Sequence, residues 1–155
     1  MKGNQKIIDE INFLLADELT AISQYMVHSE MCKNWGYEKL ADTIEKRAID
    51  EMKHAETHIE RILFLEGLPI VSNLNKINIG TDVLTILKND HAAEDVAIRE
   101  YNKAIKLCGD LADNGTREIL DDILGDEEAH IDWIEAQLDQ IAQMGIQNYL
   151  VEQLG

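Results

Sequence analysis

The sequence contains an internal repeat that strongly restricts how the chain can fold. A glutamate, a second glutamate 33 positions later and a histidine three positions beyond it occur twice. The same shift of 76 positions takes Tyr25 to Tyr101 and Asp50 to Asp126. The repeat therefore predicts two helical hairpins that meet head to head and bring both sets of glutamate and histidine side chains, which are potential metal ligands, to one point. Those sets are Glu18, Glu51 and His54, then Glu94, Glu127 and His130.

Apolar residues recur at three- and four-residue steps over four long segments, which predicts four amphipathic helices. Gly36 and the turn signal at residues 113–115 separate the two helices of each pair, and Thr81 or Asp82 is a suitable cap for the third helix. A short fifth helix follows Gly145. The predicted helices span about residues 5–34, 38–66, 83–111, 116–144 and 146–154.

The connector after Gly67-Leu68-Pro69, which runs to Gly80, shows no helical period and is too long for a hairpin turn. It is long enough to run the length of a bundle, so the second and third helices are predicted to be parallel. The predicted fold class is all-α, a ferritin-like four-helix bundle with one long crossover connection and a short C-terminal fifth helix. We expect a single domain over residues 1–155.

The net charge of -16 disfavours binding to nucleic acid or to an anionic membrane surface. No segment approaches the length of a membrane span, and no apolar signal-peptide core follows the N-terminus, so we expect a cytoplasmic protein. Cys32 and Cys108 are predicted to be free, buried thiols.

The repeated acids lie on the apolar stripes of their helices. Glu18, for example, has Leu15 one turn before it and Ile22 one turn after it. A buried carboxylate without a partner costs several kcal/mol, and four of them together would repel one another. Two divalent cations would neutralise four carboxylates. The alternative is that these acids lie at the rim and pair with Lys or Arg, which the two-fold repetition of the whole pattern disfavours.

The ligand types favour iron or manganese. Four carboxylates and two imidazoles are harder than the usual zinc set and softer than an all-oxygen calcium shell. Two glutamates with two Glu-x-x-His motifs are the known ligand set of ferritin-like di-iron proteins. His28, His58 and His91 lack a carboxylate in the paired register, so we expect them at the surface or in packing, with His58 placed to support His54.

The chain resembles bacterioferritins over essentially its whole length. The resemblance implies a shell of twenty-four identical subunits that stores ferric mineral, each subunit being a ferroxidase that oxidises Fe(II) with O2 or H2O2 at a di-iron centre. It also implies that the six repeated residues are the iron ligands, with Glu51 and Glu127 bridging, and that Tyr25 hydrogen-bonds a ligand or supplies an electron. The resemblance rests on residues 1–3, 34–36, 50–55, 59–69, 126–133 and 145–150.

Met52 on its own would be read as a core methionine. The resemblance implies instead that it is an axial ligand of haem b, shared between two subunits at a two-fold interface, with Ile49 and Leu19 lining the pocket. It further implies an iron–sulfur ferredoxin as the electron donor for iron release. Some family members have a histidine where this chain has Lys46, paired with Asp50 as an iron site on the inner surface, so that site is in doubt here.

Two other functions fit the same residues. One keeps the two-metal site but uses it for peroxide removal or a manganese catalase-like reaction. The other is a haem-binding structural subunit of a mixed shell. A rubrerythrin-type protein is disfavoured because no Cys-x-x-Cys pair is present.

Overall fold

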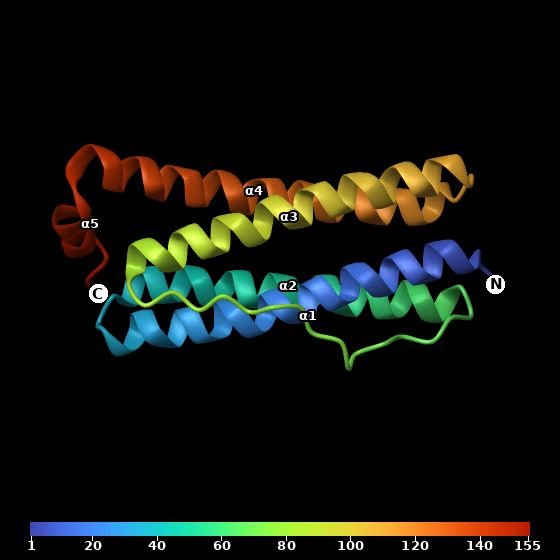
Figure 1. Ribbon diagram of the computed structural model, residues 1–155, viewed down its shortest axis with the longest axis horizontal. Helices are drawn as coiled ribbons and strands as arrows, with labels where there is room; N and C mark the ends of the chain where they lie inside the picture. The colour runs from blue at the N-terminus through green and yellow to red at the C-terminus, as the bar shows by residue number, and fades with distance from the viewer.

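The computed structural model describes residues 1–155 and contains helices but no strands. Two antiparallel hairpins, α1 with α2 and α3 with α4, pack together as a four-helix bundle, and α5 lies at one end (Figure 1). The predicted fold class is therefore confirmed. None of the helices combines the length and the apolar character that a membrane span requires. The helices are α1 (Gln5–Asn34), α2 (Glu38–Phe64), α3 (Val83–Asp110), α4 (Asn114–Met144) and α5 (Ile146–Glu152).

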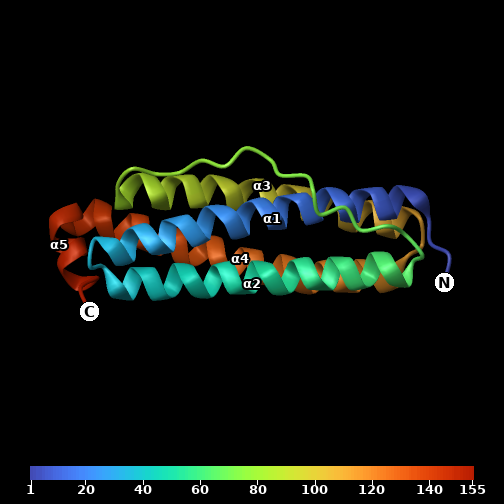
Figure 2. The same ribbon diagram turned by 90° about the horizontal axis from the view of Figure 1, so that it is seen from below.

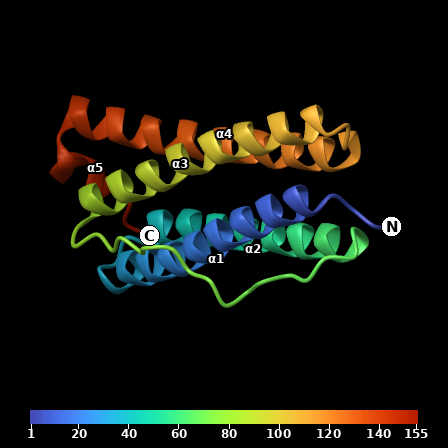
Figure 3. The same cartoon turned by 45° about the vertical axis from the view of Figure 1, so that its right-hand side comes forward.

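The connector over residues 65–82 runs along the bundle from the end of α2 to the start of α3. It follows the side formed by α1 and α3, as Figure 2 and Figure 3 show. The crossover therefore leaves α2 and α3 parallel, as the length of the connector predicted. This topology is what allows the two hairpins to be related by an approximate two-fold axis across the bundle.

A buried network fixes the end of the crossover to the bundle. His28 Nδ1 lies 2.8 Å from an Asp90 carboxylate oxygen, and His28 Nε2 accepts the backbone N–H of Gly80 at 3.0 Å. Gln24 donates to the same Asp90 oxygen and accepts the backbone N–H of Asn78. Because His28 and Asp90 are fully buried, these bonds tie the connector to α1 and α3, so of the two places expected for His28, surface or packing, the structure shows packing.

The hydrophobic core consists of two clusters, one toward each end of the bundle. The first cluster includes Ile11, Leu14, Ile62 and Leu120. The six repeated polar residues occupy helix positions between the two clusters, so each end of the bundle is apolar and its middle is polar. The second cluster includes Ile44, Ile86, Leu87, Ile134 and Tyr149.

The ends of three helices share one geometry. At the end of α1, Gly36 has φ 85°, and the N–H groups of Gly36 and Tyr37 bond back to the last turn as a Schellman motif. Ala112 occupies the repeat-related position after α3 with φ 56°. Glu66, which follows α2 and has no such counterpart, has φ 62°. Two predicted boundaries are thus corrected. The second helix was predicted to reach Glu66 but ends at Phe64, because Glu66 itself adopts the left-handed conformation that ends the helix before Gly67.

The second correction concerns the turn between α3 and α4. Residues 113–115 were predicted to form it, but Asp113 caps α4 by accepting the N–H of Thr116, and Asn114 and Gly115 are helical. The chain reverses at Leu111 and Ala112 instead. Asp-Asn-Gly signals a turn by composition, yet aspartate is also a favoured helix cap, and here the capping interaction decides the boundary.

We expect Ala112→Gly to stabilise the protein by about 0.5–1 kcal/mol. Alanine is strained at positive φ, and glycine relieves more energy there than it costs in chain entropy. The matched variant Gly36→Ala introduces the same strain at the repeat-related turn, where no atom would contact the added Cβ. It should lower stability by a similar amount. Denaturant unfolding followed by circular dichroism measures both, and a destabilised Ala112→Gly variant would contradict this account.

Candidate metal centre

The six repeated side chains point into the middle of the bundle from all four helices. Glu18 of α1 and Glu94 of α3 each contribute one carboxylate, while α2 and α4 contribute the two Glu-x-x-His pairs. The four glutamates are between 1% and 3% exposed, which excludes the alternative of rim residues in solvent. Positions three apart lie on one helix face, so each Glu-x-x-His pair enters the centre together.

The cluster forms two overlapping groups. In each group, one ligand atom per residue lies within 4.8 Å of the others. Glu51 and Glu127 belong to both groups, and the remaining members are unique to one. The arrangement therefore has the form of two adjacent metal positions joined by two shared carboxylates. The groups are Glu18, Glu51, His54 and Glu127, and Glu51, Glu94, Glu127 and His130.

Both histidines direct Nδ1 toward the centre. His54 Nδ1 lies 2.9 Å from Glu127 Oε1, and His130 Nδ1 lies 3.2 Å from Glu51 Oε1. The two imidazole rings are 6.4 Å apart between centroids. Each histidine therefore meets the glutamate of the other hairpin, as the head-to-head arrangement requires.

The outer nitrogens of the same rings meet two aspartates. His54 Nε2 lies 2.9 Å from Asp126 Oδ2, and His130 Nε2 lies 3.4 Å from Asp50 Oδ2. Each aspartate precedes a cluster glutamate by one residue and reaches the histidine of the opposite hairpin. A carboxylate on the outer nitrogen fixes the orientation of a ligand histidine. Asp126 was seen in the sequence only as part of the repeat, and Asp50 as an inner-surface acid.

Two tyrosines contact the cluster across the hairpins. Tyr25 of α1 donates to Glu94 Oε1 at 2.6 Å, and Tyr101 of α3 donates to Glu18 Oε1. Both tyrosines are 1% exposed. The position expected for Tyr25 from the family resemblance agrees with this contact. Tyr101 was missed, although its place in the repeat was a signal that could have identified it.

Two further residues lie near the cluster: Arg47, which was not predicted there, and His58, which was expected to support His54 but contacts Tyr101 instead. The Arg47 Nη2 atom lies 2.7 Å from Glu94 Oε1, and the guanidinium stacks 4.5 Å from the centre of the Tyr25 ring. His58 Nε2 lies 2.6 Å from the Tyr101 hydroxyl. Neither Arg47 nor His58 has a counterpart in the repeat, so the sequence pattern that located the ligands could not locate them.

Burial and mutual charge shift the pKa values of the cluster glutamates in different directions. Burial, reinforced by the charge of Glu51, raises the pKa of Glu18 and of Glu127 well above the usual range. Burial also opposes ionisation of Glu94, but hydrogen bonds from Glu127 and His130 and the charge of Arg47 outweigh it and lower its pKa.

The histidines differ according to the charges that they face. Burial disfavours the charged form of His130, yet the nearby carboxylates of Glu51 and Glu94 raise its pKa to about 9. His58 faces no carboxylate directly, and burial with the charge of His54 lowers its pKa to about 3. Burial also disfavours the charged form of His54, but its contacts with Glu127, Glu18 and Glu51 raise its pKa, so the histidines of the cluster and His58 shift in opposite directions.

Several buried atoms at the centre lack a well-oriented hydrogen bond, although some lie within 3.2 Å of an oppositely charged group. They belong to the four residues of one group, and each could donate a lone pair to a cation. Buried polar atoms without such a bond are rare and call for an explanation such as a bound ion. The donor set therefore fits a metal site. The atoms are Glu51 Oε1, Glu94 Oε2, Glu127 Oε1 and His130 Nδ1.

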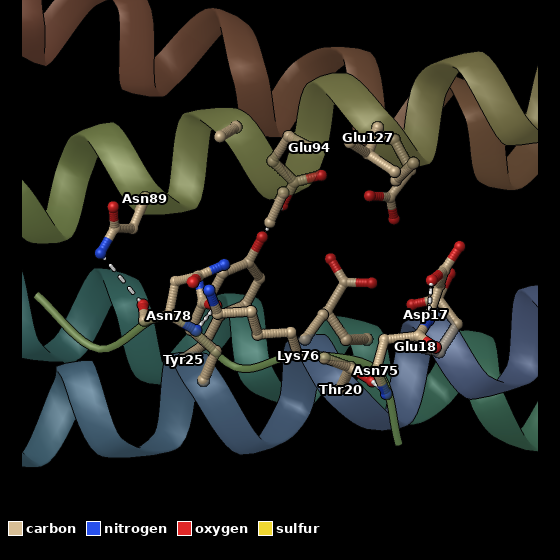
Figure 4. Close-up of a pocket in the computed structure, with 17 residues that line it drawn as sticks. Asp17, Glu18, Thr20, Tyr25, Asn75, Lys76, Asn78, Asn89, Glu94 and Glu127 are labelled. Atoms are coloured by element: carbon tan, nitrogen blue, oxygen red, sulfur yellow. Dashed lines mark hydrogen bonds between the residues drawn. The ribbon is translucent and has the colours of Figure 1, made fainter. Parts of the chain in front are cut away.

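A cavity of about 240 Å³ lies beside the cluster and extends to the crossover. Figure 4 shows Glu94 and Glu127 pointing into it, with Tyr25 in contact with Glu94. The crossover contributes Asn75, Lys76 and Asn78 to the lining. A small molecule could therefore approach the carboxylates from the side of α1 and α3.

Met52 lies on the outer face of α2 and is 45% exposed, although its neighbours Glu51 and His54 are buried. It borders a shallow, mainly apolar depression that includes Ile49 and Met26. Leu19, which was expected to line the same pocket, is absent from this lining and packs partly against the core instead. Lys46 is exposed.

A four-helix bundle with one long crossover and a central cluster of carboxylates and histidines defines a ferritin-like protein. A family model of the ferritin-like domain matches residues 8–144. The chain is 38% identical to the bacterioferritin of Brucella melitensis, over 96% of this chain and 92% of that protein. It is 42% identical to the bacterial ferritin of Paramagnetospirillum magnetotacticum, over 100% of this chain and 96% of that protein. It is 41% identical to the bacterial ferritin of Neisseria meningitidis serogroup B, over 99% of this chain and 100% of that protein. The chain belongs to the bacterioferritin family.

Removal of metal should destabilise the folded protein. A ligand that binds only the folded state at a free concentration a hundredfold above its Kd contributes about 2.7 kcal/mol. We therefore expect Co²⁺ to raise the thermal midpoint of chelator-treated protein in differential scanning calorimetry. The Glu127→Gln variant should fold but show little of this increase, whereas the exposed neighbour variant Glu128→Gln should behave as wild type. An equal shift in all three proteins would argue against a metal site at the cluster.

Proposed function

We propose that this protein stores iron and that each chain is a ferroxidase, with the six-residue cluster as the place where two Fe(II) ions are oxidised. The observation that supports this most strongly is the pair of four-residue groups that share Glu51 and Glu127. Two ions held by shared carboxylates lie next to each other, which a site for a single ion would not require. Membership of the bacterioferritin family supports the same role.

The ligand set suits this chemistry. Carboxylates stabilise ferric iron, and they can change between terminal and bridging binding as the charge of the ions changes. Two ferrous ions together release two electrons, which is the number that reduces O2 to H2O2 or H2O2 to water. In this proposal iron is the substrate, and Glu18, Glu94, His54 and His130 each bind one ion while the shared glutamates bind both.

The surrounding residues would position the ligands. Asp126 and Asp50 hold the rings of His54 and His130, and Tyr25 holds Glu94 and could supply an electron to the centre. Carboxylate partners of this kind commonly affect metal affinity by about 10–100-fold. The cavity between the crossover and the cluster would admit the oxidant, O2 or H2O2, to the carboxylates.

We further propose that twenty-four copies assemble into a shell in the cytoplasm, with ferric mineral inside and an iron–sulfur ferredoxin as electron donor for its release. Several large apolar side chains are exposed on the single chain, which suits burial between subunits. These include Phe13, Trp35, Phe64 and Leu68.

Haem b would bind between two subunits with Met52 from each as an axial ligand. A half-exposed methionine beside Ile49, Ala48, Ile22 and Met26 offers a thioether and an apolar surface, which fits a haem shared by two copies. When bound, the haem would supply one-electron redox chemistry at the shell wall.

The two other functions are less well supported. A haem-binding structural subunit would not need all six buried ligand-type residues, yet all six are present at the centre. Peroxide removal uses the same cluster and differs only in the oxidant. Comparison of iron oxidation rates with O2 and with H2O2 distinguishes that alternative from O2-dependent ferroxidase activity.

Anaerobic addition of Fe(II) followed by air should give a rapid increase in ferric absorbance that corresponds to about two irons per subunit, as two metal positions require. Glu127→Ala should abolish this phase, because the residue belongs to both groups. Glu128→Ala removes an exposed acid on the same helix and should leave the phase intact. If Glu127→Ala oxidises iron as fast as wild type, the proposed site is wrong.

Protein purified from cells supplied with haem should show haem absorption bands, and Met52→Leu should lose them while its mass by size-exclusion chromatography stays unchanged. Met144→Leu, which alters a similarly exposed methionine at the far end of α4, is the matched control. Haem bands of normal intensity in Met52→Leu would rule out this axial ligand.

A further inference from the structure

The internal repeat provides a comparison between the two metal positions within one chain. The ligands match under the shift of 76 positions, and so do the tyrosines that contact Glu18 and Glu94. Some of the residues around them do not match. Arg47 of α2 corresponds to Ile123 of α4, so only one of the two positions has an arginine beside it.

The guanidinium of Arg47 is held rigidly against one ligand. It is 4% exposed, its Nη2 atom lies 2.7 Å from Glu94 Oε1, and it stacks on the ring of Tyr25 at 4.5 Å. The ring centre of Trp133 lies 5.9 Å away on α4. Because Tyr25 donates to the same Glu94 oxygen, two donors already occupy that atom and only Glu94 Oε2 is free.

The ligand at the other position has no arginine beside it. Glu18 accepts from Tyr101, whose hydroxyl contacts the ring of His58. The counterpart of Arg47, Ile123, is an apolar core residue that is 5% exposed. The two positions therefore have equivalent ligands but different nearby charge.

We propose that Arg47 makes the two positions unequal, so that a divalent cation fills the Glu18–His54 position before the Glu94–His130 position. An arginine keeps its charge at every working pH, and in a buried site its repulsion of a dication is only weakly screened. A proton on a carboxyl group leaves when a metal binds, but the guanidinium charge remains. A difference of about tenfold or more in affinity follows from a charge at this distance. The inference rests on the proposed two-metal centre.

The test is the occupancy of each position at limiting metal. Crystals of the metal-free assembled protein are soaked with one equivalent of Co²⁺ per subunit, and the two anomalous peaks are compared. In wild type we expect most of the cobalt at the Glu18–His54 position. Arg47→Met keeps the length that covers Tyr25 and Trp133 but removes the charge, and it should give nearly equal peaks. Arg47→Lys keeps the charge and should retain the preference.

The possible outcomes separate this inference from the function on which it rests. Equal peaks in wild type, or an unchanged preference in Arg47→Met, would overturn the role of Arg47 while leaving the two-metal centre in place. Cobalt at neither position, even at saturating concentration, would overturn the proposed centre itself. The wild-type measurement decides the order of filling even if a variant does not fold.

Discussion

Four buried carboxylates in the middle of a helical bundle are the constraint on which the rest of this structure depends. Left empty and ionised, they would repel one another and lose their hydration. The protein surrounds them with hydrogen bonds from histidine, tyrosine and arginine, but several carboxylate oxygens remain without a well-oriented hydrogen bond. Apolar clusters lie on both sides of this middle layer. Cations that bind between the carboxylates would remove the repulsion, and so the most costly feature of the fold is also the one suited to its proposed function.

The duplicated hairpin explains why the contacts at the centre cross between the two halves. Tyr25 reaches Glu94 while Tyr101 reaches Glu18, and Asp126 reaches His54 while Asp50 reaches His130. Such crossed pairs need two hairpins in opposite orientation, and the long crossover supplies that arrangement. The network of His28 and Asp90 that ties the crossover to α1 and α3 therefore supports the centre indirectly.

Much of the fold and of the candidate centre could be predicted from the sequence, because both depend on periodicity. Apolar spacing located the helices, and the shift of 76 positions brought Glu18, Glu94 and their partners together before any contact was known. The turn after α3 was misplaced because Asp113 can either form a turn or cap a helix, and only the capping contact with Thr116 decides. Arg47 was missed, and the contact of His58 with Tyr101 was not foreseen, for a different reason. Both residues are specific to one half, and their contacts with Glu94 and Tyr101 arise from packing between helices that are distant in sequence.

The central claim is that the buried carboxylates are held together in order to bind two iron ions side by side. Anomalous diffraction at the iron edge, from crystals soaked anaerobically with excess Fe(II), tests this directly. The account predicts two peaks per subunit in the middle of the bundle, one next to His54 and one next to His130, with Glu51 and Glu127 in contact with both. A centre that remains free of iron, or one that holds a single ion at saturation, would contradict it.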